Sequence, residues 1–145
     1  MYFKNILSAF PSYLILEITE HTFAENLDKA KKILKTIKSF NIKIALDDFG
    51  VGYSSLNYLK DLPINILKID LSFIKSMVDD TKTYYIVATI INLAHYLNIK
   101  TVAEGVETKT QLEILKKLKC DYVQGFLLSP PLSGEKIENL IKSKK

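Results

Sequence analysis

The polar side chains that could do chemistry share one position: each lies at or near the end of a short apolar segment. They are Glu17, Asp47, Asp48, Lys68, Asp70, Glu104 and Gln124. If these segment ends meet in space, their carboxylates repel one another unless a cation lies between them. A ligand set made only of oxygen atoms is typical of Mg²⁺, Mn²⁺ or Ca²⁺. The pattern therefore predicts a divalent metal site.

Two of these carboxylates are neighbours in the stretch "IALDDFGVGYSSL", residues 44–56. Adjacent side chains on a regular strand point to opposite faces. Gly50 and Gly52 lie just beyond, and glycine lets a backbone turn, so we expect Asp47 and Asp48 both to reach cations. Two metal ions about 3.5–4 Å apart form a clamp for in-line displacement at phosphorus. For Asp70, capping of the following segment is the favoured role.

The elements that must position these residues alternate between short apolar runs and longer amphipathic ones. The length and period of these runs predict strands at 13–18, 42–47, 65–70, 100–104 and 121–124. Helices are expected in the intervals, with start signals at Thr22 with Glu25, near residue 55, at Thr81 or Thr83, at Thr108 with Gln111, and near Ser133. This α/β order of five βα units predicts a parallel sheet with right-handed crossovers, in which the strands' carboxyl ends form the ligand-binding rim.

Composition narrows the function classes. The chain has 145 residues, 48% of them hydrophobic, which suits one domain. Its 20 basic residues are all lysine and are spread over helix faces, so nucleic acid polymers are not expected partners. No apolar stretch approaches the roughly 20 residues that span a bilayer, and a cytoplasmic location is expected. His21 and His95 lack partners at zinc-ligand spacing.

Four segments together resemble the EAL domain, a family of bacterial cyclic di-GMP phosphodiesterases. They are "LEITE" (16–20), "ALDDFGVGYSSLNYLKDLPINILKID" (45–70), "TVAEGVET" (101–108) and "CDYVQGFLLSPPL" (120–132). The alternative that "DFG" marks a protein kinase fails because the chain has no His-Arg-Asp catalytic loop. The resemblance implies a TIM-like (β/α) barrel that opens cyclic di-GMP to the linear dinucleotide, using a metal-activated water and Mg²⁺ or Mn²⁺.

The resemblance also implies roles for individual residues. Glu17 and Asp47 would hold the metals and Asp48 would complete the second site. Lys68 would orient the water and stabilise the transition state, and Glu104 would act as general base or as a further ligand. Gln124 would hold water or substrate. Glu20 and Glu107 would support the site, with Glu20 anchoring the loop after "DDFG".

One difference from the family is large. The Glu-Ala-Leu motif that names it has no counterpart here, and five βα units are expected instead of eight. We therefore expect a partial barrel in which residues 1–145 are the C-terminal portion of an EAL domain. Besides cyclic di-GMP, its expected partners are a second copy of the chain or an upstream EAL segment. A non-catalytic binding or interaction module and an inert fragment are the alternatives to an enzyme.

Overall fold

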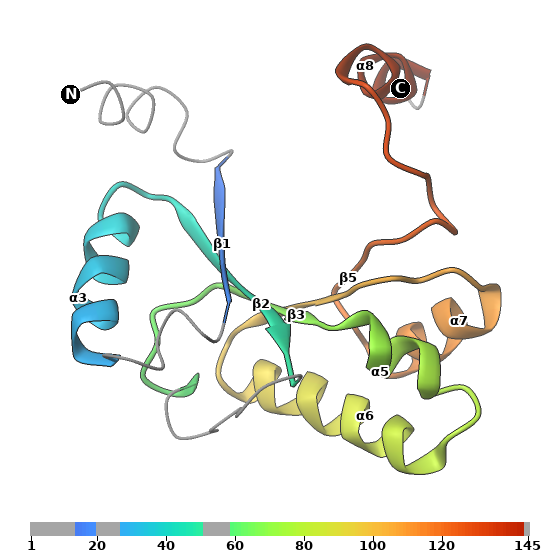
Figure 1. Cartoon of the computed structure of the whole chain (residues 1–145), viewed down its shortest axis with the longest axis horizontal. Helices are drawn as coiled ribbons and strands as arrows, with labels where there is room; N and C mark the ends of the chain where they lie inside the picture. Colours follow the sequence, from blue (N-terminus) through green and yellow to red (C-terminus); the bar gives the residue numbers. More distant parts are fainter. Residues whose placement is uncertain (1–13, 20–26, 51–58, 144–145) are drawn as a thin grey trace.

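The strands form one parallel sheet in chain order (Figure 1). The computed structural model describes residues 14–19, 27–50 and 59–143. The strands are β1 (Ile15–Thr19), β2 (Lys43–Phe49), β3 (Ile66–Ile69), β4 (Lys100–Ala103) and β5 (Tyr122–Val123). All five predicted strands are present and all four neighbouring pairs are parallel, so the expected α/β architecture is confirmed.

In the residues that the structure describes, helices follow β1, β3, β4 and β5. They are α3 (Leu27–Lys38), α5 (Leu71–Ser76), α6 (Thr81–Tyr96), α7 (Lys109–Lys117) and α8 (Gly134–Ser143). The capping box of Thr108 with Gln111 is present at α7. The predicted start at Thr22 with Glu25, and residues 55–58 of the predicted short helix, lie outside the described residues.

Two helix starts depend on aspartates. Asp70 caps α5, because its side chain accepts a hydrogen bond from the backbone N–H of Ser72 at 2.9 Å, so its favoured structural role is confirmed. Helix α6 was expected to be capped by Thr81 or Thr83, and this was wrong. Asp80 is the cap: it accepts from the N–H groups of Lys82 and Thr83, and an ionised carboxylate is a stronger acceptor than a hydroxyl.

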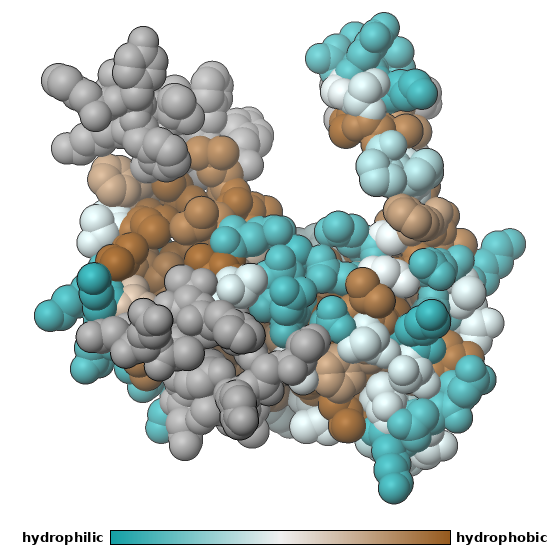
Figure 2. Space-filling view, viewed as in Figure 1, coloured by the Kyte–Doolittle hydropathy of each residue, from teal (hydrophilic) through white to brown (hydrophobic). Residues whose placement is uncertain are grey.

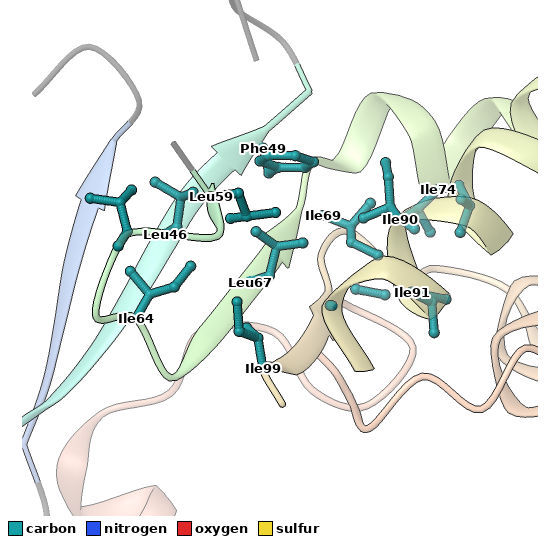
Figure 3. Packing of buried hydrophobic residues seen from close by; sticks show 14 of the residues in the cluster. Leu46, Phe49, Leu59, Ile64, Leu67, Ile69, Ile74, Ile90, Ile91 and Ile99 are labelled. Atoms are coloured by element: carbon teal, nitrogen blue, oxygen red, sulfur yellow. The ribbon is translucent and has the colours of Figure 1, made fainter. Parts of the chain in front are cut away.

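The core lies between the sheet and the helices that cover it. Figure 3 shows Leu67 and Ile69 of β3 in its middle, between Leu46 of β2 and the isoleucines 90 and 91 of α6. Leu67 and Ile69 have no exposed surface. These two side chains lie on the same face of β3, so that face of the central strand is buried against the helices that cover the sheet.

The described strands form part of a barrel wall rather than a closed barrel, with β1 and β5 at its two edges. Large apolar side chains are exposed near these edges, among them Ile15 in β1 and Phe126 beyond β5. Figure 1 shows α8 at the end of an extended segment, away from the sheet, and Figure 2 shows apolar surface around β1 and below α8. Among the described helices, none is long and apolar enough to cross a membrane.

Candidate metal centre and active site

Strand register places the predicted site residues on one face of the sheet. Glu17 pairs with Ala45, two residues before Asp47. Lys68 pairs with Val102, two residues before Glu104. Residues paired in register share a face, and so do residues two apart on a strand, so side chains from β1 to β4 converge beyond the carboxyl ends of the strands.

Lys68 is at the centre of this convergence. Its Nζ lies 2.8 Å from Glu104 Oε1, 3.0 Å from Asp47 Oδ1 and 3.0 Å from Glu17 Oε1. The Lys68 side chain is only 7% exposed, whereas that of Glu17 is 52% exposed. One buried ammonium thus holds together carboxylates from three strands.

Burial and charge act in opposite directions on these groups. Burial alone lowers the pKa of Lys68, but hydrogen bonds to Glu104, Asp47 and Glu17 outweigh it and hold that pKa above its usual value. Burial raises the pKa of Glu104; Lys68 opposes this rise, while the charges of Asp47 and Asp48 add to it. The cluster therefore keeps Lys68 charged and favours the neutral form of the Glu104 carboxyl.

A bulge in β2 brings the two adjacent aspartates to the same rim. The β2–β3 register shifts between Leu46 and Phe49, and Asp48 has a φ of 54°, in the left-handed region. Its backbone N–H donates to Asp47 Oδ1 at 3.1 Å. The turn was expected from Gly50 and Gly52, but it begins at Asp48 itself, and Gly52 lies outside the described residues.

Three of the carboxylates fit a divalent cation. One oxygen from each of Asp47, Asp48 and Glu104 lies within 4.8 Å of the other two. Hard oxygen donors of this kind suit Mg²⁺ or Mn²⁺ better than softer metals. The donor set in the described residues therefore matches the metal type that the sequence predicts.

The remaining predicted residues are outside this cluster. The exposed side chain of Gln124 borders a hollow of about 420 Å³ next to the segment that leads to α8. Its backbone is bonded to the end of β4, next to Glu104, because Gln124 N donates to Ala103 O at 2.8 Å. Glu107 is exposed, in the loop after β4. Glu20 lies outside the described residues.

Gln111 was expected only as part of a capping box, but its side chain is buried and contacts the loop that carries Glu104. Its partner in α5, Ile74, is 37 residues away along the chain. A capping signal reports local geometry alone, so no pattern in the sequence indicates this second contact.

Comparison with known proteins agrees with the geometry. A family model described as EAL domain matches residues 2–131, most of the chain. The chain belongs to the EAL domain family. The resemblance drawn from the four sequence segments is thus confirmed.

Similar proteins include some whose names refer to cyclic di-GMP. The chain is 47% identical over 127 residues to the bifunctional diguanylate cyclase/cyclic di-GMP phosphodiesterase MucR of Pseudomonas aeruginosa, covering 88% of this chain and 18% of MucR. The solved cyclic di-GMP complex of the PaMucR phosphodiesterase is 46% identical, with a TM-score of 0.87, covering 92% of this chain and 56% of that one.

A third relative includes a metal. A manganese/cyclic di-GMP complex of Klebsiella pneumoniae BlrP1 is 33% identical, with a TM-score of 0.78, covering 83% of this chain and 31% of that one. The chain thus spans less than a fifth of the length of MucR and about half of the solved PaMucR chain.

Proposed function

We propose that the chain forms the metal-dependent part of a cyclic di-GMP phosphodiesterase, which hydrolyses cyclic di-GMP to the linear dinucleotide in the bacterial cytoplasm. The observation that carries this proposal is the cluster of Asp47, Asp48 and Glu104 beside Lys68, on the rim of an EAL-type sheet. Mg²⁺ or Mn²⁺ is the proposed metal. The manganese in the BlrP1 complex supports this choice.

The carboxylates divide between two tasks. Glu17, Asp47 and Asp48 would hold the metal ions, which supply a water of lowered pKa and neutralise phosphate charge when bound. Glu104 would accept the proton of the attacking water or join the ligands, and its raised pKa suits a proton acceptor.

The other residues would bind and orient. Lys68 would place its charge against a phosphate oxygen as negative charge develops there. Gln124, beside the hollow beyond β5, would hold substrate or water. Glu107 and Glu20 would support the loops around the site.

We further propose that residues 1–145 are the C-terminal portion of an EAL barrel, completed by a segment with the Glu-Ala-Leu motif. Three more βα units would bring the five described here to the usual eight. Strand edges attract further strands, and both edges of this sheet also lie near exposed apolar side chains. The completing segment would add further ligands to those that Asp47 and Asp48 supply.

A second copy is the other proposed partner, and the outer face of α6 is the surface for it. Tyr85, Ile86 and Tyr96 are 64%, 44% and 87% exposed, and residues 83–94 carry no acidic or basic side chain. A two-fold interface brings like residues together, so an uncharged face avoids repulsion. Light scattering should show a dimer that Tyr85→Lys weakens, whereas Lys35→Glu, at an exposed position of α3, should not. A monomeric unsubstituted chain would contradict this.

Hydrolysis is tested by measuring the linear dinucleotide formed from cyclic di-GMP in Mg²⁺ or Mn²⁺. The chain is assayed alone and mixed with a separately expressed EAL segment that contains the missing motif. We expect product from the mixture and little from the chain alone. Product that is unaffected by Asp47→Asn would contradict the proposed site. Binding of intact cyclic di-GMP without any product would indicate the alternative, a non-catalytic binding module.

A further inference from the structure

Three polar side chains are buried in the part of the chain that the structure describes: Lys68, Thr101 and Gln111. Lys68 belongs to the carboxylate cluster. Thr101 lies at the opposite end of β4, where its hydroxyl bonds to Asp121 at 3.0 Å. Gln111, in α7, is 5% exposed and has no part in the proposed chemistry. Burying an amide is unfavourable unless its hydrogen bonds are satisfied, so its partners indicate its role.

Gln111 joins three segments around the rim. Its Oε1 accepts hydrogen bonds from the backbone N–H groups of Glu107 at 2.8 Å and Thr108 at 2.9 Å. Its Nε2 donates to the carbonyl of Ile74 in α5 at 3.3 Å. Its own N–H donates to Thr108 Oγ1 at 3.2 Å. The side chain thus ties the end of the loop after β4 to the helix that follows β3.

That loop begins with Glu104, and it approaches α5 closely at a second point. Gly105 has a φ of 64°, and a Cβ there would lie 2.6 Å from Leu71 Cβ. Glu104 N also donates to Ile69 O, at the end of the strand that carries Lys68. Residues 104–108 are therefore held against the β3–α5 segment at their start, at Gly105 and, through Gln111, at their end.

We propose that Gln111 is a positioning residue for the metal centre: by tying the 104–108 loop to α5 it sets where the Glu104 carboxylate meets Asp47 and Asp48. The inference rests on the metal centre proposed above. Gln111 touches neither the carboxylates nor a substrate and acts through the loop. Residues that orient metal ligands commonly change metal affinity by about 10–100-fold when they are removed.

The test measures Mn²⁺ affinity of the full chain by titration calorimetry, with Mn²⁺ as the only added ligand. Gln111→Met keeps the length and apolar stem of the side chain but removes its hydrogen bonds, and we expect Mn²⁺ to bind about tenfold more weakly. The matched control is Thr101→Val, which removes a buried hydroxyl from the far end of β4. Both variants lose stability, but only Gln111→Met should lose affinity.

A milder pair covers the case in which Gln111→Met does not fold. Thr108→Ala removes the hydroxyl that accepts from Gln111 N, and Thr108→Ser restores one. We expect weaker Mn²⁺ binding in the alanine variant and recovery in the serine variant. Hydrogen exchange of the Glu107 and Thr108 amides should accelerate in step with the loss of affinity, in the absence of metal as well.

The outcomes separate this inference from the proposed function. If the unsubstituted chain binds no Mn²⁺, its own carboxylates do not form a metal site by themselves and the inference is overturned. If the unsubstituted chain binds Mn²⁺ and the Gln111 and Thr108 variants bind it equally well, only the positioning role is overturned. Equal losses of affinity in Gln111→Met and Thr101→Val would also overturn it, because general destabilisation would then explain both.

Discussion

Lys68 Nζ lies 2.8 Å from Glu104 Oε1, and this contact joins the ends of two neighbouring strands. The lysine is almost fully buried, and the Glu104 side chain is 16% exposed. A protein cation thus occupies the middle of the carboxylate cluster and compensates charges that would otherwise repel. Lys68 is thus a structural counter-ion as well as a proposed participant in catalysis, and the two roles make different predictions.

Replacing Lys68 by methionine should destabilise the metal-free chain and make added metal more stabilising. Breaking a buried ion pair by removing one partner costs about 3–5 kcal/mol, because Glu104 and Asp47 lose their compensating charge. A divalent cation can supply that charge instead. We therefore expect Mn²⁺ to raise the melting temperature of Lys68→Met by more than that of the unsubstituted chain, as measured by thermal unfolding.

Lys31→Met is the control for this experiment. Lys31 pairs with the exposed Asp61 at 2.9 Å, and neither residue belongs to the carboxylate cluster around Lys68. Exposed pairs contribute about 0–1 kcal/mol, so this variant should unfold almost as the unsubstituted chain does and respond equally to Mn²⁺. If Mn²⁺ raised the melting temperatures of Lys68→Met and Lys31→Met equally, Lys68 and the metal would not compensate the same carboxylate charges.

Asp47→Asn should weaken Mn²⁺ binding, whereas Asp70→Asn should leave it nearly unchanged. Asp47 contributes an oxygen to the three-carboxylate group, and its substitution removes a charged ligand. Asp70 caps α5, and asparagine is an equally good capping residue. Calorimetric titration of both variants checks this. Similar affinities for the two would count against Asp47 as a ligand.

The fold was largely readable from the sequence, because each strand is a short apolar run bounded by polar residues and each crossover is longer. Helix α5 was not predicted: its six residues, "LSFIKS", are too few to show a helical period, and its start depends on the Asp70 cap. The rim carboxylates were predicted because strand ends meet in a parallel sheet. The bulge at Asp48 was not, since it depends on the register with β3.

Asp121 should make stability depend on pH. Burial alone would raise its pKa, but hydrogen bonds from Lys100, the Thr101 backbone and His95 hold the pKa far below its usual value. Because the folded-state pKa is depressed, the stabilisation is fully present above the unfolded-state value of about 3.9 and is lost as pH falls below it.

The variant Asp121→Asn should therefore cost about 1–3 kcal/mol at pH 7 and less at pH 3, where Asp121 is largely protonated in the unfolded chain but still ionised in the folded one. Urea unfolding of both proteins at pH 7, 5 and 3 measures the difference in unfolding free energy. A cost that does not change with pH would show that packing, rather than the charge of Asp121, stabilises this end of the sheet.

Alanine at Gly105 should damage the site, whereas alanine at Gly134 should not. At Gly105 the positive φ of 64° disfavours any side chain, and the new Cβ would lie 2.6 Å from Leu71 Cβ, so the loop carrying Glu104 must move away from α5. At Gly134, the first residue of α8, a Cβ would meet no atom within 4 Å. Alanine is also the better helix former there.

We expect Gly105→Ala to lose about 1–3 kcal/mol of stability and to bind Mn²⁺ more weakly. Gly134→Ala should match the unsubstituted chain in affinity. Thermal unfolding and calorimetric titration measure the two effects. If Gly105→Ala lost stability but kept its Mn²⁺ affinity, Glu104 would not depend on the contact between its loop and α5.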